Sequence, residues 1–184
     1  MALILGLDIA TTTGWAIYDT DKTPSAIVSG SFKLQGATPF ERVRYMRSHL
    51  PRLIKEHRPD FAAIEAPMEI APRFTRAKTD MLGEQEQETT INSKTIAVLN
   101  RYAGAAEMAV MGNNIPCVEV AARTWQTIIP KTIKGKPKQR AKAFCDMHRI
   151  VSPNMDSRDA CIIAMWAAGH CQELKLMQRT GRAA

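Results

Sequence analysis

The chain has 184 residues, enough for one domain with a sizeable buried core. Its 45% hydrophobic and 23% charged residues are typical of a soluble globular protein, and neither a membrane-spanning run nor a signal peptide is expected. A net charge of +7 and a pI near 9.4 favour a polyanionic partner, nucleic acid before membrane, although a merely solvated basic surface is also common at this charge.

The four cysteines show no C-x-x-C spacing and have no histidine at zinc-finger spacing. We therefore expect reduced, mostly buried thiols in a cytoplasmic protein and no zinc site. The residues concerned are Cys117, Cys145, Cys161 and Cys171.

Residues 3–10 form an apolar run of strand length, and a turn at 11–14 leads to a second expected strand at 15–18. So apolar a run belongs in the middle of a sheet, buried on both faces. Asp8 lies inside it, and burial of a carboxylate is unfavourable unless a partner or a metal ion compensates its charge. Two interpretations are open: Asp8 caps the neighbouring turn, or it takes part in metal or phosphate chemistry.

Residues 25–34 alternate apolar and small side chains and predict a third strand. Because the connections are short, the first three strands should form an antiparallel meander. A helix then begins with Thr38 as N-cap, Pro39 at the first helical position and Glu41 at the third. Pro51 should kink or split this helix.

A fourth strand is predicted over residues 60–65 and ends in Glu65, so a second apolar strand delivers a carboxylate to its end. Residues 68–90 are the least regular part, a functional or mobile loop with room for a short helix of its own. A helix is predicted over residues 93–111. The loop carries three basic candidates for phosphate contacts: Arg73, Arg76 and Lys78.

The densest positive charge follows a fifth strand at 115–120 and a short helix at 124–129. Six phosphate contacts from this segment would give nucleic-acid binding a steep salt dependence. A flexible basic loop with no partner is the alternative. A further helix is expected over 140–149. The basic residues are Lys131, Lys134, Lys136, Lys138, Arg140 and Lys142.

The last helix begins near Asp156, and its first turn places Asp156 and Asp159 on one face. One interpretation is helix capping, with Asp156 as the N-cap. Asp159, however, is followed by an almost wholly apolar stretch, which indicates that its carboxylate faces the sheet or its edge. The single domain should cover residues 1–178, and 179–184 should form a flexible tail.

These elements predict an α/β domain in which the strands that carry Asp8 and Glu65 are neighbours. The two acids of the last helix could then join them. Several close carboxylates repel one another unless divalent cations neutralise them, and such hard oxygen ligands suit Mg²⁺ or Mn²⁺. Two ions in such a site could bind a scissile phosphate and activate water.

On four segments in this order the chain resembles the RuvC family of Holliday junction resolvases, within the ribonuclease H-like superfamily. The likeness spans residues 3 to about 169. The segments are Ile4-Leu5-Gly6-Leu7-Asp8 with Thr13-Gly14-Trp15, then Ala63-Ile64-Glu65, then Val118-Glu119-Val120-Ala121-Ala122-Arg123, then Asp156-Ser157-Arg158-Asp159-Ala160.

The resemblance implies a ribonuclease H-like fold: a mixed five-stranded sheet, three strands antiparallel and then two parallel, with helices on both faces. It implies a homodimer, packed on the helix at 93–111, that binds four-way DNA junctions and makes paired symmetric nicks. It also implies two Mg²⁺ ions per active site, with Mn²⁺ as a substitute and no small-molecule cofactor. The acids that match the family's metal ligands are Asp8, Glu65, Asp156 and Asp159.

The chain departs from the family pattern in two places. Ala10 stands where the family usually has glycine, and the segment after Glu65 is longer than usual. The bacterial enzymes place an aromatic wedge just beyond the matching glutamate, for which Met68 is the nearest candidate here and Phe74 a second. The divergence suggests a phage or mobile-element relative acting in a bacterial cytoplasm.

Three other functions compete with this one. The loop at 8–14 also resembles the first phosphate loop of sugar-kinase and actin-like ATPases, but those proteins need two such lobes and 184 residues supply one. A nuclease of the same superfamily could use the same acids on RNA–DNA hybrids or flapped branches. A junction-binding or structural protein without metal is the third alternative.

Overall fold

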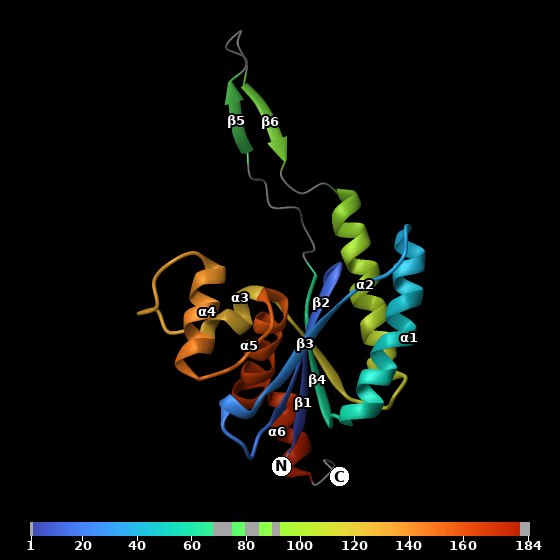
Figure 1. The fold of residues 1–184 in the computed structure, drawn as a ribbon, viewed down its shortest axis with the longest axis vertical. Coiled ribbons are helices and arrows are strands. Elements are labelled where there is room, and N and C mark those ends of the chain that lie inside the picture. The colour runs from blue at the N-terminus through green and yellow to red at the C-terminus, as the bar shows by residue number, and fades with distance from the viewer. Residues whose placement is uncertain (1, 68–74, 80–84, 90–92, 181–184) are drawn as a thin grey trace.

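The computed structural model describes residues 2–67, 75–79, 85–89 and 93–180. Five strands form one mixed sheet in the order β3-β2-β1-β4-β7 (Figure 1). β1, β2 and β3 are antiparallel, whereas β1, β4 and β7 run parallel. The predicted sheet is therefore confirmed, including the pairing of the strands that carry Asp8 and Glu65. The strands are β1 Leu3–Asp8, β2 Thr12–Asp19, β3 Val28–Lys33, β4 Phe61–Glu65 and β7 Cys117–Val120.

Helices cover both faces of this sheet, as predicted (Figure 1). One face is covered by α1 (Pro39–His57) and α2 (Ser93–Met111). The other is covered mainly by α5 (Met155–His170), which lies against β1 and β2. The remaining elements are η1 Pro24–Ala26, α3 Ala122–Trp125, η2 Gln126–Ile128, α4 Pro137–Met147 and α6 Gln172–Arg179.

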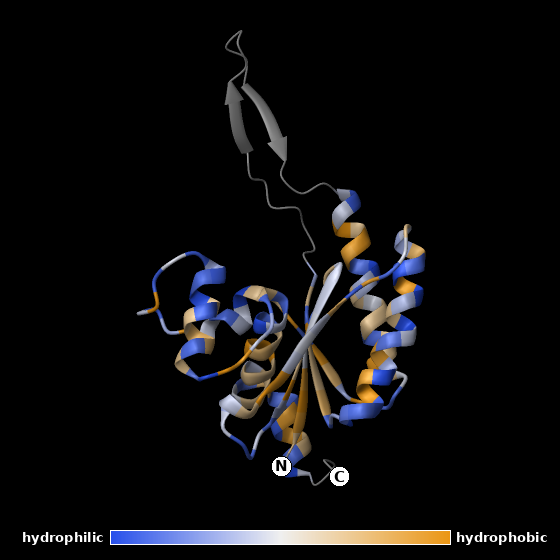
Figure 2. Ribbon diagram, viewed as in Figure 1, coloured by the Kyte–Doolittle hydropathy of each residue, from blue (hydrophilic) through white to orange (hydrophobic). Residues whose placement is uncertain are grey.

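The strict alternation of side chains along the central strands divides the hydrophobic core into two layers. Leu5 and Leu7 of β1 pack in the layer under α1 and α2, whereas Ile4 packs in the layer under α5. On β4, Ala63 belongs to the α5 layer. Figure 2 shows hydrophobic residues along the strands and hydrophilic residues on the outward sides of the helices. By the same alternation, the residues that end β1 and β4 point to the α5 side.

Helix α1 begins as predicted, with Thr38 and Glu41 forming a reciprocal capping box. The predicted split at Pro51 is wrong, because α1 runs without interruption from Pro39 to His57. Proline removes one backbone hydrogen bond. The burial of Leu50 and Leu53, on either side of it, holds both halves of the helix against the sheet.

The segment predicted as an irregular loop contains an antiparallel hairpin rather than a helix. β5 (Thr75–Thr79) pairs with β6 (Gln85–Thr89). The two strands have the sequences TRAKT and QEQET, which lack the apolar alternation that predicts a half-buried strand.

Across the described residues, no helix is both long and apolar enough to cross a membrane.

Candidate active site

The first two acids of the site are placed by the parallel pairing of β1 with β4. In this register Leu7 lies beside Ile64, so the next residues, Asp8 and Glu65, end neighbouring strands at the same level. The carboxyl ends of parallel strands share one edge of the sheet. Both side chains therefore leave that edge on the α5 side.

The second pair of acids is placed by α5, which approaches the sheet unusually closely. Gly14 pairs with Asp8 across β1 and β2, and a Cβ atom added to Gly14 would lie 2.0 Å from the Asp156 carbonyl oxygen. A Cβ atom added to Gly6 would lie 2.2 Å from the Ala160 carbonyl oxygen. The two glycines thus let the helix backbone rest directly on the strands. This contact sets the first turns of α5 above Asp8.

The start of α5 is fixed by a cap that does not involve the acids. Asn154 is the N-cap: its side chain accepts from the Ser157 backbone N–H at 2.9 Å, and its backbone N–H donates to the Ser157 hydroxyl at 3.2 Å. The Asn154 amide also hydrogen-bonds the hydroxyl of Ser31 on β3. The interpretation of Asp156 as the cap is therefore wrong. Asp156 and Asp159 both lie inside the helix, with their carboxylates not used for capping.

All four predicted acids line one cavity of about 290 Å³, so the structure brings together the set that the sequence singled out. Four further polar or aromatic side chains line the same cavity. The acids and these further residues are Asp8, Glu65, Asp156, Asp159, Trp125, Gln126, Lys138 and Arg140.

The carboxylates are electrostatically unfavourable where they stand. Burial raises the pKa of Asp8 from 3.8 to about 8, and the negative charge of Glu65 is the next cause. Asp159 and Asp156 act in the same direction, whereas Lys138 lowers the pKa of Asp8. Burial is also the main reason that the pKa of Glu65 rises to about 7 and that of Asp159 to about 6. The cavity therefore disfavours the charged forms of Asp8, Glu65 and Asp159.

The donor set fits a hard divalent cation. Carboxylate oxygens are the ligands that Mg²⁺ and Mn²⁺ prefer, and a dication would compensate both the burial of these acids and their mutual repulsion. Within the described residues, no group of three or more His, Cys, Asp or Glu side chains has the geometry of a formed metal site. The four acids thus line the cavity without converging on one point.

The predicted basic segment lies beside this cavity, and its members differ in their contacts. Lys138, at the start of α4, lines the cavity itself. Arg140 also lines it, but its guanidinium donates to the carbonyl oxygens of Ile129 and Ile133 at 3.3 and 3.1 Å and so holds the preceding loop. Lys142 pairs with Asp146 at 2.8 Å.

The other three lysines of the segment are exposed, and in the described part of the chain they form no ion pair. They are Lys131, Lys134 and Lys136. Of the predicted contacts in the 68–90 segment, Arg76 and Lys78 belong to β5. Arg73 and both wedge candidates, Met68 and Phe74, lie outside the described residues.

Trp125 was not predicted as part of the site. Its side chain is 2% exposed and lines the cavity together with Glu65. The sequence places it in a short helix of apolar and polar residues, where a tryptophan is expected simply as core. Only the position of this helix, directly after the strand beside β4, indicates a role at the site.

The comparisons with solved structures identify the fold. A Thermus thermophilus RuvC in complex with a Holliday junction substrate superposes with a TM-score of 0.64 at 14% sequence identity, covering 98% of this chain and 97% of that one. Another Thermus thermophilus RuvC structure gives a TM-score of 0.62 at 15% identity, covering 97% and 96%. The chain therefore has the fold of these RuvC structures, as the sequence resemblance predicted.

The same fold extends to a more distant protein. The yeast mitochondrial Holliday junction resolvase Ydc2 has a TM-score of 0.54 at 10% identity, over 97% of this chain and 84% of that one. No family model matches the sequence, and no curated protein is similar to it in sequence.

Proposed function

We propose that this protein is a metal-dependent endonuclease that resolves four-way DNA junctions by paired, symmetric nicks. The observation that carries the proposal is the gathering of four acids from β1, β4 and α5 in one cavity, with a lysine on its wall. Two proteins of the same fold are a RuvC bound to a Holliday junction substrate and a Holliday junction resolvase. The basic charge of the chain suits such a DNA substrate.

In this proposal the metal ligands are Asp8, Glu65, Asp156 and Asp159. Two Mg²⁺ or Mn²⁺ ions held there would supply an activated water and stabilise the charge on the leaving oxygen. Asp8 and Glu65 come from the rigid sheet, whereas the other two acids come from a capped helix held down by close backbone contact. The scaffold thus holds the ligands on strands and a helix rather than on loops, which suits a site that must place a phosphate accurately.

The basic residues act on the DNA rather than on the metal. Lys138 lies on the cavity wall and would contact the phosphate at the cleavage site. The exposed lysines at 131, 134 and 136, with the basic residues of β5, would contact phosphates of the DNA backbone beyond the cleavage site. Such contacts give affinity without sequence preference.

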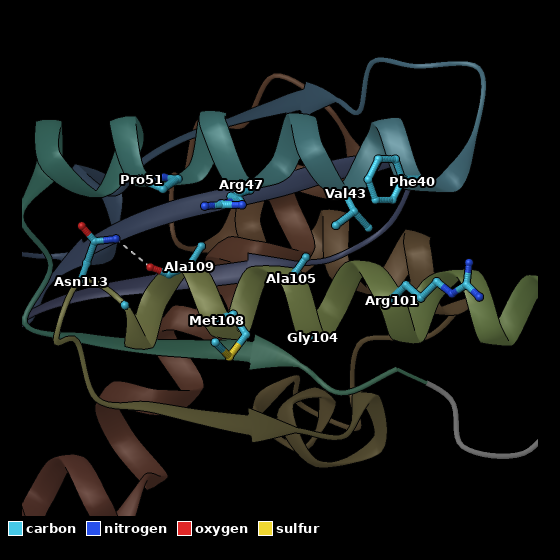
Figure 3. Close-up of a pocket in the computed structure, with 11 residues that line it drawn as sticks. Phe40, Val43, Arg47, Pro51, Arg101, Gly104, Ala105, Met108, Ala109 and Asn113 are labelled. Carbon is cyan, nitrogen blue, oxygen red and sulfur yellow. Dashed lines mark hydrogen bonds between the residues drawn. The ribbon is translucent and has the colours of Figure 1, made fainter.

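We further propose that the protein acts as a homodimer that packs across α1 and α2. Two symmetric nicks need two active sites. A groove of about 910 Å³ runs between these helices, and its walls are mainly apolar (Figure 3). Phe40 on α1 and Met108 on α2 line it and are 76% and 70% exposed. Exposed apolar side chains on such a surface favour burial against a second copy.

Gel analysis of a labelled synthetic four-way junction with Mg²⁺ tests the proposal, beside linear duplex and an RNA–DNA hybrid. The expected result is two symmetric nicks that give religatable duplexes, and their loss in Asp8→Asn. Cleavage of the hybrid alone would refute junction resolution and indicate a ribonuclease with the same site. Tight junction binding without cleavage in Mg²⁺ or Mn²⁺ would refute the nuclease and leave a binding protein.

A further inference from the structure

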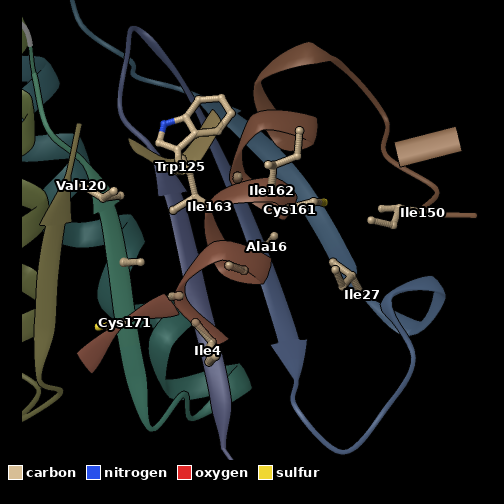
Figure 4. Packing of buried hydrophobic residues seen from close by; sticks show 14 of the residues in the cluster. Ile4, Ala16, Ile27, Val120, Trp125, Ile150, Cys161, Ile162, Ile163 and Cys171 are labelled. Carbon is tan, nitrogen blue, oxygen red and sulfur yellow. The ribbon is translucent and has the colours of Figure 1, made fainter. Parts of the chain in front are cut away.

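Trp125 has a buried polar atom that the fold itself leaves unused. The indole Nε1 is fully buried, and among the residues that the structure describes no acceptor meets hydrogen-bond geometry with it. Figure 4 shows the Trp125 ring above Ile163 at one end of the α5-side core, with its nitrogen on the side of Val120. A buried N–H without an acceptor is unfavourable, so such groups normally have a partner in the functional state of a protein.

The backbone places this N–H beside the end of β4. Val120 of β7 pairs with Glu65 of β4, and the backbone N–H of Ala66 donates to the Val120 carbonyl at 2.9 Å. Helix α3 starts two residues after Val120, with the Trp125 backbone N–H donating to the Ala121 carbonyl at 3.3 Å. The short connection therefore brings Trp125 to the end of β4, where its side chain and that of Glu65 line the same cavity.

Glu65 is the nearby acceptor that the indole can reach. Both side chains line the same cavity. The Trp125 side chain also lowers the pKa of Glu65, against the larger effect of burial. A carboxylate on the same cavity wall is an acceptor of the kind that this donor needs.

We propose that Trp125 is a positioning residue whose indole N–H donates to the Glu65 carboxylate when the site is loaded with a divalent cation. The bond would fix the rotamer of Glu65 and leave its other oxygen free for the cation. In other metalloproteins, hydrogen bonds of this charge-assisted kind orient the metal ligands. The loss of such a bond typically weakens metal binding roughly 10- to 100-fold. The inference rests on the proposed metal site.

The direct test is the indole ¹H–¹⁵N spectrum of the whole protein during titration with Mg²⁺. The chain has three tryptophans, and Trp15→Phe and Trp166→Phe assign the third signal by elimination. We expect the Trp125 indole proton to move downfield with Mg²⁺, while the Trp15 and Trp166 signals stay in place. Glu65→Gln should abolish the shift. A Trp125 signal that Mg²⁺ leaves unmoved would overturn the proposal.

A second measurement is Mn²⁺ affinity, read by electron paramagnetic resonance without any DNA. Trp125→Phe keeps the aromatic ring but removes the N–H, and we expect it to bind Mn²⁺ about tenfold or more weakly than the wild type. Trp15 packs against His57 in the layer under α1 and α2 and does not line the cavity, so Trp15→Phe should bind like the wild type. Equal affinity of Trp125→Phe and the wild type would refute the role. If Trp125→Phe does not fold, the wild-type spectrum alone decides.

These readouts separate this inference from the proposed function. A wild type that binds Mn²⁺ and shifts its Trp125 signal, yet cuts no junction, would support the positioning role and refute junction resolution. Junction cleavage together with an unmoved Trp125 signal and an unchanged Mn²⁺ affinity in Trp125→Phe would support junction resolution and refute the positioning role.

Discussion

Replacing Asp8 by asparagine should stabilise the metal-free protein while abolishing the proposed nuclease activity. Burial and the neighbouring carboxylates raise the pKa of Asp8 from 3.8 to about 8. The unfolded chain releases the proton near the lower value, whereas the folded chain keeps it up to the higher one. Native stability is therefore lost as the pH rises between these two values, and it is unaffected below the lower one.

The magnitude follows from this interval. pH 7 lies about three pH units above the ordinary pKa of Asp8. At ~1.4 kcal/mol per unit, the loss of folding free energy caused by Asp8 is therefore at most about 4 kcal/mol. The true penalty is smaller, because Glu65 and Asp159 share the repulsion and any of the three can hold the proton. We expect Asp8→Asn to gain about 1–2 kcal/mol at neutral pH, or roughly 2–8 °C in Tm for a domain of this size.

Thermal unfolding with a chelator present, at about pH 5 and about pH 8, measures this effect. The gain from Asp8→Asn should be clearly larger at the higher pH. Asp146→Asn is the matched control, because Asp146 is exposed and pairs with Lys142, so its loss should change Tm little. Added Mg²⁺ should raise Tm in the wild type more than in Asp8→Asn. An Asp8→Asn variant no more stable than the wild type at the higher pH would refute the argument.

Three further predictions concern the scaffold, the DNA contacts and the dimer. Gly14→Ala should displace the start of α5, lowering stability by about 1–3 kcal/mol in unfolding experiments and junction cleavage much more. Lys138→Ala should weaken binding to all DNA sequences alike and reduce the salt slope by about 1 in filter-binding titrations, whereas Lys142→Ala should do less because that lysine is already paired. Met108→Glu should yield monomers in light scattering. Met147 is 56% exposed on α4, away from the proposed interface, so Met147→Glu should remain dimeric. If both variants were monomeric, or both dimeric, the proposed face would be contradicted.

Most of the fold could be predicted because the central strands are buried on both faces. Such strands appear in the sequence as short apolar runs, and a carboxylate at the end of a run stands out. The strands ending in Asp8 and Glu65 were identified in this way, and their pairing needed only the order of elements. Asp159 stood out for a similar reason, as an acid leading an apolar helix.

The parts that were missed depend on interactions that have no hydrophobic signal. The hairpin of β5 and β6 is held by backbone pairing between polar sequences. The cap of α5 is Asn154, which the two acids that follow it obscured. The sequence also gave Arg140 the same role as the lysines around it. Only its hydrogen bonds to two carbonyl oxygens show that it holds the loop next to the site.

The acids of the site repel one another, and close packing around them is needed to keep them together. Four acids repel one another and would separate if the helix that carries two of them could move away. Gly6 and Gly14 allow the helix backbone to rest on the strands, and the Asn154 cap fixes its start. The placement of the acids thus depends on strand order and on a few close backbone contacts. A RuvC that is only 14% identical shares this fold over nearly the whole length of both chains.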